Sequence, residues 1–115
     1  MNTREKGSRG EERAIDYLLQ NGYTIVTRNY QSRKGEIDCI AQDEEGTFVF
    51  IEVKSAQSSG GGHPFYWVNR GKQRKIAALA KRYLYEHGLY GKPCRFDVIA
   101  VTNSTIDHLK NAFLV

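Results

Sequence analysis

Apolar residues predominate in two neighbouring runs that flank an acidic turn within residues 35–55. Both runs are rich in β-branched and aromatic residues, and the turn ends in glycine, so the pattern predicts a β-hairpin. A three-residue loop with Gly46 in the left-handed conformation pairs Asp43 with Thr47. This pairing sets the register of the whole hairpin.

The predicted register gathers charged side chains on one face of the hairpin. Asp38 lies opposite Glu52, and Glu36 lies opposite Lys54. Because side chains alternate along a strand, all four project from the same face. The other face is expected to be wholly apolar and to carry Ile37, Cys39, Ala41, Val49, Ile51 and Val53.

Three carboxylates at this spacing repel one another, so the arrangement requires solvation, partial protonation or a bound cation. Oxygen ligands suit Mg²⁺ or Mn²⁺, which one or two carboxylates usually hold together with waters and phosphate oxygens. We therefore predict Asp38 and Glu52 as metal ligands. Lys54 is placed to orient an attacking water or to offset charge on a phosphorane. A solvated hairpin face with ordinary ion pairs is the alternative that the spacing leaves open.

Helical periodicity precedes the hairpin. Ser8 and Glu11 fit a capping box, which predicts a helix from Ser8 to about Gln20 and a loose segment at residues 1–6. Glu11 lies on the inward stripe, so both a capping role and a metal-ligand role stay open for it. The other inward residues are Ala14, Ile15, Leu18 and Leu19.

The remaining elements complete an α/β pattern. We predict a strand at 23–30, a helix at 69–86 and an apolar strand at 95–101 that Asp97 interrupts, whereas the tail at 106–115 fits a strand or a short helix. Asp97 is expected to form a buried ion pair rather than to bind metal. The order of helix, three strands, helix and strand predicts a sandwich with a mixed sheet. The buried stripe of the second helix should comprise Ile76, Leu79, Ala80, Tyr83 and Leu84.

Composition indicates one globular domain spanning residues 1–115, with 40% hydrophobic and 26% charged residues. No apolar run has the length of about 18 residues that a membrane span needs, and the two cysteines lack metal-site spacing. We therefore expect a cytoplasmic protein without a membrane partner. Its formal net charge of +4 suits a polyanionic partner.

Basic residues cluster in the turn before the hairpin and on the second helix. Such cations can hold a phosphate backbone with little sequence preference, although a solvated helix face carries the same pattern. Residues 56–64 are expected to form a flexible loop, and the aromatic run 65–67 either stacks on bases or covers the core. The predicted nucleic-acid-binding residues are Arg28, Arg33, Lys34, Lys72, Arg74 and Lys75.

The motif Glu52-Val53-Lys54, preceded by an aspartate on the neighbouring strand, resembles the core of the restriction-endonuclease-like nucleases. More narrowly, the chain is similar to the YraN-type family of uncharacterised bacterial proteins, which is related to archaeal Holliday junction resolvases. The motifs that carry the resemblance span nearly the whole chain. They are Gly10-Glu11 with Ala14, Gly22-Tyr23, Arg28-Asn29, Gly35-Glu36-Ile37-Asp38, Phe50-Ile51-Glu52-Val53-Lys54, Lys72, Arg95-Phe96-Asp97-Val98 and Ala112-Phe113.

This resemblance implies a restriction-endonuclease-like three-layer sandwich with core order αβββαβ. It implies a divalent-metal-dependent endonuclease that hydrolyses phosphodiester bonds in nucleic acid, DNA rather than RNA, in structured or branched form. Glu11 becomes a third metal ligand, Glu36 completes the shell, and Lys72 lies near the scissile phosphate. The resemblance also implies a homodimer.

Two other functions remain open. The chain can be a non-catalytic nucleic-acid-binding module or an assembly partner that keeps the nuclease fold. A protein-interaction domain without nucleic acid fits the net positive charge less well.

Overall fold

The computed structural model describes residues 3–33, 35–55 and 68–113 of the chain. The elements are α1 (Thr3–Gln20), β1 (Thr24–Ser32), β2 (Gly35–Gln42), β3 (Phe48–Ser55), α2 (Arg70–Glu86), β4 (Cys94–Val101) and β5 (Ile106–Leu109). The tail that the sequence left undecided thus begins with a strand, β5. The strands form one mixed sheet in the order β1-β2-β3-β4-β5, in which β3 and β4 are parallel and the other neighbours are antiparallel.

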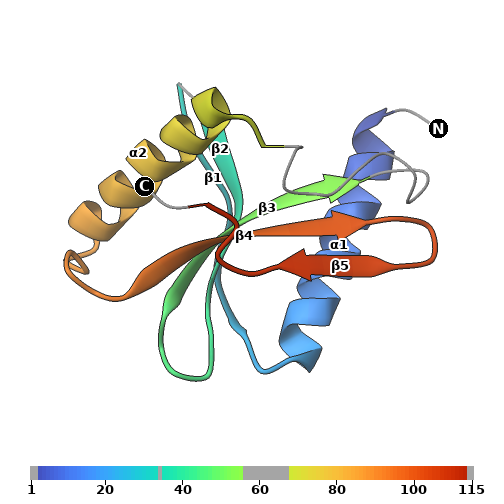
Figure 1. Ribbon diagram of the computed structural model, residues 1–115, viewed down its shortest axis with the longest axis horizontal. Coiled ribbons are helices and arrows are strands. Elements are labelled where there is room, and N and C mark those ends of the chain that lie inside the picture. The colour runs from blue at the N-terminus through green and yellow to red at the C-terminus, as the bar shows by residue number, and fades with distance from the viewer. Residues whose placement is uncertain (1–2, 34, 56–67, 114–115) are drawn as a thin grey trace.

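The two helices lie on opposite sides of the sheet (Figure 1). Each covers its own apolar core: Leu18 of α1 packs with Cys39 and Ile51, whereas Leu79 of α2 packs with Phe50. The sheet is therefore the middle of three layers. This arrangement confirms the predicted three-layer α/β sandwich with a mixed sheet and core order αβββαβ, which β5 extends by one strand.

The hairpin has the predicted register. Asp43 N–H donates to the Thr47 carbonyl at 3.1 Å, and Gly46 takes the left-handed conformation with φ of 87°. Pairing then runs along the strands to Cys39 and Ile51. The turn chemistry read from the sequence therefore fixes which residues of β2 and β3 meet.

The predicted apolar face of the hairpin is confirmed except for Ile37, but the opposite face is apolar as well. Ile40, Phe48 and Phe50 lie on the side covered by α2, whereas Cys39, Ala41, Val49 and Ile51 lie on the side covered by α1. Both faces are apolar because β2 and β3 are central strands between two helical layers. Glu52 follows Phe50 on the α2 side of β3, where Lys72 contacts it.

Ile37 departs from the prediction, because it lies in the α2-side core and not with Cys39. Asn29 of β1 and Asp38 of β2 are not paired with each other, although the residues on either side of them are. Asn29 also has a left-handed φ of 54°. The regular alternation of side chains is interrupted at this point. Asp38 is thereby released from the pleat and can turn toward β3.

The start of α1 differs from the prediction. The helix begins at Thr3, so Ser8 is not its N-cap, and the segment predicted to be loose is helical from Thr3 on. The polar residues before Ser8 include good helix formers, which let the helix extend upstream. Without that cap, the capping role considered for Glu11 is excluded.

Leu19 also differs from the prediction, which placed it on the inward stripe of α1. Its side chain is 54% exposed, because it follows Leu18 and is therefore rotated by about 100° from it around the helix.

The second helix and the fourth strand match the sequence closely. The N-cap of α2 is Asn69, and all five residues of the predicted stripe are buried. Asp97 forms the expected buried ion pair, with Arg95. No described helix is long and apolar enough to cross a membrane. The predicted loop at 56–64, the aromatic run 65–67 and Lys34 lie outside the described residues.

Candidate active site

Asp38 and Glu52 lie where β2 and β3 separate. They are only 8% and 6% exposed, respectively. Ladder pairing ends one position before them, at Cys39 and Ile51, and Asp38 Oδ2 accepts a hydrogen bond of 2.8 Å from the Val53 N–H. The carboxylate of β2 is thus held against the strand that carries Glu52.

Burial and the neighbouring charge disfavour ionisation of Asp38. Burial raises the pKa of this carboxyl, the negative charge of Glu52 raises it further, and the result is about 7. The hydrogen bond from Val53 opposes both effects but does not outweigh them. Partial protonation, one of the three conditions expected to make the acidic cluster tolerable, therefore applies to Asp38.

We predict that Asp38→Asn stabilises the metal-free protein at pH 8. Because the folded-state pKa is raised, the unfolded chain loses this proton first, and stability falls as pH rises from about 4 to about 7. Asparagine removes that penalty while its oxygen can still accept the Val53 N–H. Urea unfolding in EDTA should show a gain on the order of 2 kcal/mol at pH 8 and none at pH 4. An equal or lower stability at pH 8 would contradict this electrostatic description.

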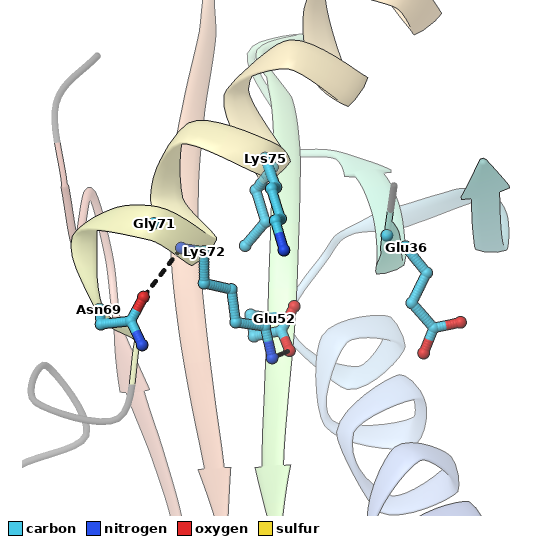
Figure 2. Close-up of a pocket in the computed structure, with 8 residues that line it drawn as sticks. Glu36, Glu52, Asn69, Gly71, Lys72 and Lys75 are labelled. Atoms are coloured by element: carbon cyan, nitrogen blue, oxygen red, sulfur yellow. Dashed lines mark hydrogen bonds and ion pairs between the residues drawn. The ribbon is translucent and has the colours of Figure 1, made fainter. Parts of the chain in front are cut away.

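Glu52 carries two cations on one oxygen. Lys72 Nζ lies 2.7 Å and Lys54 Nζ 3.4 Å from Glu52 Oε1. Figure 2 shows Lys72 reaching from the first turn of α2 to this carboxylate. The second oxygen, Oε2, is buried and has no hydrogen-bond partner among the described residues. Glu52 is therefore neutralised on one side and left unsatisfied on the other.

The two ammonium groups influence each other. Burial lowers the pKa of Lys54, and Lys72 lowers it further despite the attraction of Glu52. Burial alone would lower the pKa of Lys72 as well, but its contacts with Glu52 and Lys54 outweigh burial and raise it. Lys72 therefore holds its proton more firmly than Lys54.

The cap of α2 positions Lys72. Asn69 Oδ1 accepts a hydrogen bond of 2.9 Å from the Lys72 N–H, which fixes the first turn of the helix over β3. Sequence reasoning predicted Lys72 as a nucleic-acid contact but missed its ion pair with Glu52. Only the packing of α2 on the sheet shows which strand residue Lys72 meets.

A cavity of about 430 Å³ opens at this point. It lies between the first turns of α2 and the ends of β2 and β3, with both acidic and basic side chains in its wall (Figure 2). Its lining comprises Gly35, Glu36, Glu52, Asn69, Gly71, Lys72, Lys75 and Ile76.

Glu36 does not occupy the predicted position opposite Lys54. It pairs instead with Gln31 of β1, whose Nε2 donates to Glu36 Oε2 at 3.0 Å. The reason is that β2 and β3 part after Cys39, so position 36 keeps only its β1 neighbour. Glu36 still lines the cavity, but Figure 2 shows it apart from Glu52.

Helix α1 contributes Glu11 to the same region. A Cβ on the preceding Gly10 would overlap Ser55 Oγ, so glycine lets the helix approach the end of β3 closely. Burial raises the pKa of Glu11, and the charge of Glu36 raises it further. The charges of the acidic cluster thus act on the Glu11 carboxyl.

The donor set fits a hard divalent cation. A buried carboxylate oxygen without a partner, beside a second buried carboxyl, presents the oxygen chemistry that Mg²⁺ or Mn²⁺ accepts. Among the described residues, no three His, Cys, Asp or Glu side chains form a complete metal site. The structure therefore brings Asp38 and Glu52 together without adding Glu11 as a third ligand. Two carboxylates with waters suffice for magnesium.

A larger basic groove of about 690 Å³ shares Lys75 with the cavity. Arg33 and Arg74, two of the predicted nucleic-acid-binding residues, also line this groove, as does Arg82. The other lining residues are Ser32, Ala78 and Leu79. Arg28 lies elsewhere, paired with Glu12 at 2.6 Å.

The profile of the uncharacterised protein family UPF0102 matches residues 10–101. The chain belongs to this family. A UPF0102 protein of Persephonella marina is 47% identical over 108 residues, covering 94% of this chain and 92% of that protein. The UPF0102 protein of Thermodesulfovibrio yellowstonii is 47% identical over 112 residues, covering 95% and 96%. That of Clostridioides difficile is 42% identical over 115 residues, covering 98% and 100%.

Solved structures similar to this UPF0102 protein are more distant. An EndoMS–dsDNA2 complex aligns with a TM-score of 0.49 and 17% identity, covering 83% of this chain and 37% of the other. A repair endonuclease from Pyrococcus abyssi aligns with a TM-score of 0.48 and 15% identity, covering 90% and 40%. This chain spans less than half the length of either solved chain.

Proposed function

We propose that this UPF0102 protein is a divalent-metal-dependent endonuclease that hydrolyses phosphodiester bonds in structured or branched DNA. The observation that carries the proposal is the state of Glu52, which is buried beside Asp38, faces two ammonium groups and keeps one oxygen without a partner. Natural cores rarely leave a buried carboxylate oxygen unsatisfied unless it has a functional partner.

Each of these residues would have its own role in the reaction. Asp38 and Glu52 would hold Mg²⁺ or Mn²⁺, and Glu36 and Glu11 would add negative charge near the ion. The ion would supply positive charge for a phosphoryl oxygen and a more acidic water. Lys54 would orient the attacking water and offset the charge that grows on the phosphate.

The basic groove supports a polyanionic substrate. Arg33, Arg74 and Lys75 have no ion-pair partner among the described acidic residues, so their charge is available to a phosphate backbone. Contacts of this kind release counterions and bind with little sequence preference. The groove shares Lys75 with the cavity beside Glu52, so a strand bound in the groove would lie next to the acidic pair.

One observation favours the alternative of a non-catalytic nucleic-acid-binding module. Lys72 and Lys54 already neutralise Glu52 within the chain, so the acidic residues can be tolerated without a metal ion. A binding module would retain salt-dependent affinity for DNA but show no Mn²⁺ affinity that depends on Asp38 and Glu52.

A cleavage screen tests the proposal. Single-stranded, duplex, nicked and four-way-junction DNA, with RNA counterparts, are incubated with the protein and Mg²⁺ or Mn²⁺. We expect cleavage of at least one DNA substrate, complete loss in EDTA, and loss by about a hundredfold or more in Lys54→Ala. The exposed Lys92→Ala is the control for a lost surface charge. Cleavage that survives both EDTA and Lys54→Ala would refute the proposal, and salt-dependent binding without any cleavage would favour the alternative.

The groove makes a separate prediction about binding. Arg74→Ala should weaken DNA binding uniformly across sequences and reduce the slope of log affinity against log salt by about one. Lys81→Ala is the matched control, because Lys81 lies on the same helix but does not line the groove. Anisotropy titrations at several salt concentrations measure both variants. An equal loss in the two would place the DNA elsewhere.

A further inference from the structure

Lys72 is bound to the carboxylate that the proposed function assigns to a metal ion. Its Nζ lies 2.7 Å from Glu52 Oε1, and its side chain is 37% exposed at the wall of the cavity. The other oxygen of Glu52 has no partner among the described residues. In the absence of metal, the ammonium therefore occupies part of the space around Glu52 where a divalent cation would act.

The position of Lys72 allows it to change partners. A lysine ammonium is a compact charge on a flexible stem with three donors, so it can leave a carboxylate for a phosphate without losing hydrogen bonds. The cavity that it lines shares Lys75 with the basic groove. A phosphate that enters from the groove would compete with Glu52 for this ammonium.

We propose that Lys72 is an exchangeable counter-ion that couples DNA binding to divalent-cation binding, an inference that rests on the proposed nuclease function. Without DNA, Lys72 neutralises Glu52 and weakens its attraction for the cation. With DNA, the ammonium pairs with a phosphate and Glu52 becomes available. Because linkage is reciprocal, the cation must then also strengthen DNA binding by the same factor.

Two other lysines distinguish this role from a general effect of positive charge. Lys54 follows Glu52 on the same strand, so it stays beside the carboxylate in either state. Lys81 is exposed on the same helix as Lys72 but lines neither the cavity nor the basic groove. Lys81 is therefore the matched control for Lys72.

The test is calorimetric titration of Mn²⁺ into metal-free wild type, Lys72→Met, Lys72→Arg and Lys81→Met. Each titration is run with and without a short DNA that carries phosphorothioate linkages to resist cleavage. Without DNA, we expect Lys72→Met to bind Mn²⁺ about tenfold more tightly than wild type, and Lys81→Met to differ by about twofold or less. Lys72→Arg, which keeps the charge, should resemble wild type.

The coupling gives the second readout. DNA should raise the Mn²⁺ affinity of wild type and of Lys81→Met about tenfold, but that of Lys72→Met by only about twofold. Anisotropy of the same DNA with and without Mn²⁺ should give the same factors. If wild type binds Mn²⁺ but Lys72→Met neither binds it more tightly nor reduces the effect of DNA on it, the inference is overturned and the nuclease proposal stands. A wild type that binds no Mn²⁺ would overturn both.

Discussion

Glu52→Gln should reduce metal-dependent DNA cleavage about a thousandfold while the protein stays folded. Glutamine keeps the shape of the side chain but removes the negative charge and replaces one oxygen by a nitrogen that donates hydrogen bonds. The partnerless oxygen, which would face the cation, lies at this position. Lys54 and Lys72 remain partly exposed, at 26% and 37%, so water can solvate them after their partner is neutralised.

The measurement is turnover at saturating Mn²⁺, with the melting temperature recorded beside it. Glu45→Gln is the control, because Glu45 is an exposed acid in the turn of the same hairpin. It should keep wild-type turnover. Activity in Glu52→Gln within tenfold of wild type would show that this carboxylate does not take part in the chemistry.

The second large effect concerns stability. Asp97 is fully buried and accepts from Arg95 Nε at 3.1 Å and from the Asn111 N–H at 2.9 Å, and it contacts His108 Nε2 at 2.7 Å. Removing one partner from a buried charged network typically costs about 3–5 kcal/mol. Asp97→Asn should therefore lower the melting temperature by about 10 °C or more. Asp107→Asn, an exposed substitution on β5, should leave it nearly unchanged.

The same network predicts the response to acid. Burial alone would raise the pKa of Asp97, but hydrogen bonds from His108, the Asn111 backbone and Arg95 outweigh it and lower the pKa below the ordinary 3.8. The stability from this group is then complete above pH 3.8 and is lost as pH falls through the lowered value. Thermal melts from pH 7 to pH 2 should show the difference between wild type and Asp97→Asn shrinking only in this acid range. A constant difference down to pH 2 would contradict the assigned network.

Local sequence chemistry explains why the hairpin could be predicted. A glycine able to adopt positive φ defines the turn, and the turn fixes the register, so the meeting of Asp38 and Glu52 at one end followed from adjacent residues. Burial of Asp97 was also predictable, because a single acid in an apolar strand needs a partner.

The parts that sequence missed depend on contacts between distant elements. The ion pair of Lys72 with Glu52 joins α2 to β3, and which helix residue reaches the strand depends on how α2 crosses the sheet. The displacement of Glu36 depends on where β2 and β3 separate, which the interruption at Asn29 influences from a third strand. No periodicity within a single segment reports such relations.

These contacts also change the account of the acidic cluster. The sequence suggested that an inorganic cation was the economical way to neutralise it. In the structure, Lys54 and Lys72 neutralise Glu52 before any metal binds, and the raised pKa of Asp38 reduces the negative charge beside it. The proposed metal site is consequently one in which a cation competes with the protein's own ammonium groups.

The central claim is that Asp38 and Glu52 together bind a divalent cation, and calorimetric titration of Mn²⁺ into wild type and Asp38→Asn tests it most directly. We predict saturable binding to wild type and an affinity at least about tenfold weaker in Asp38→Asn, although that variant is the more stable protein without metal. Equal Mn²⁺ binding by both proteins, or binding by neither, would contradict the account.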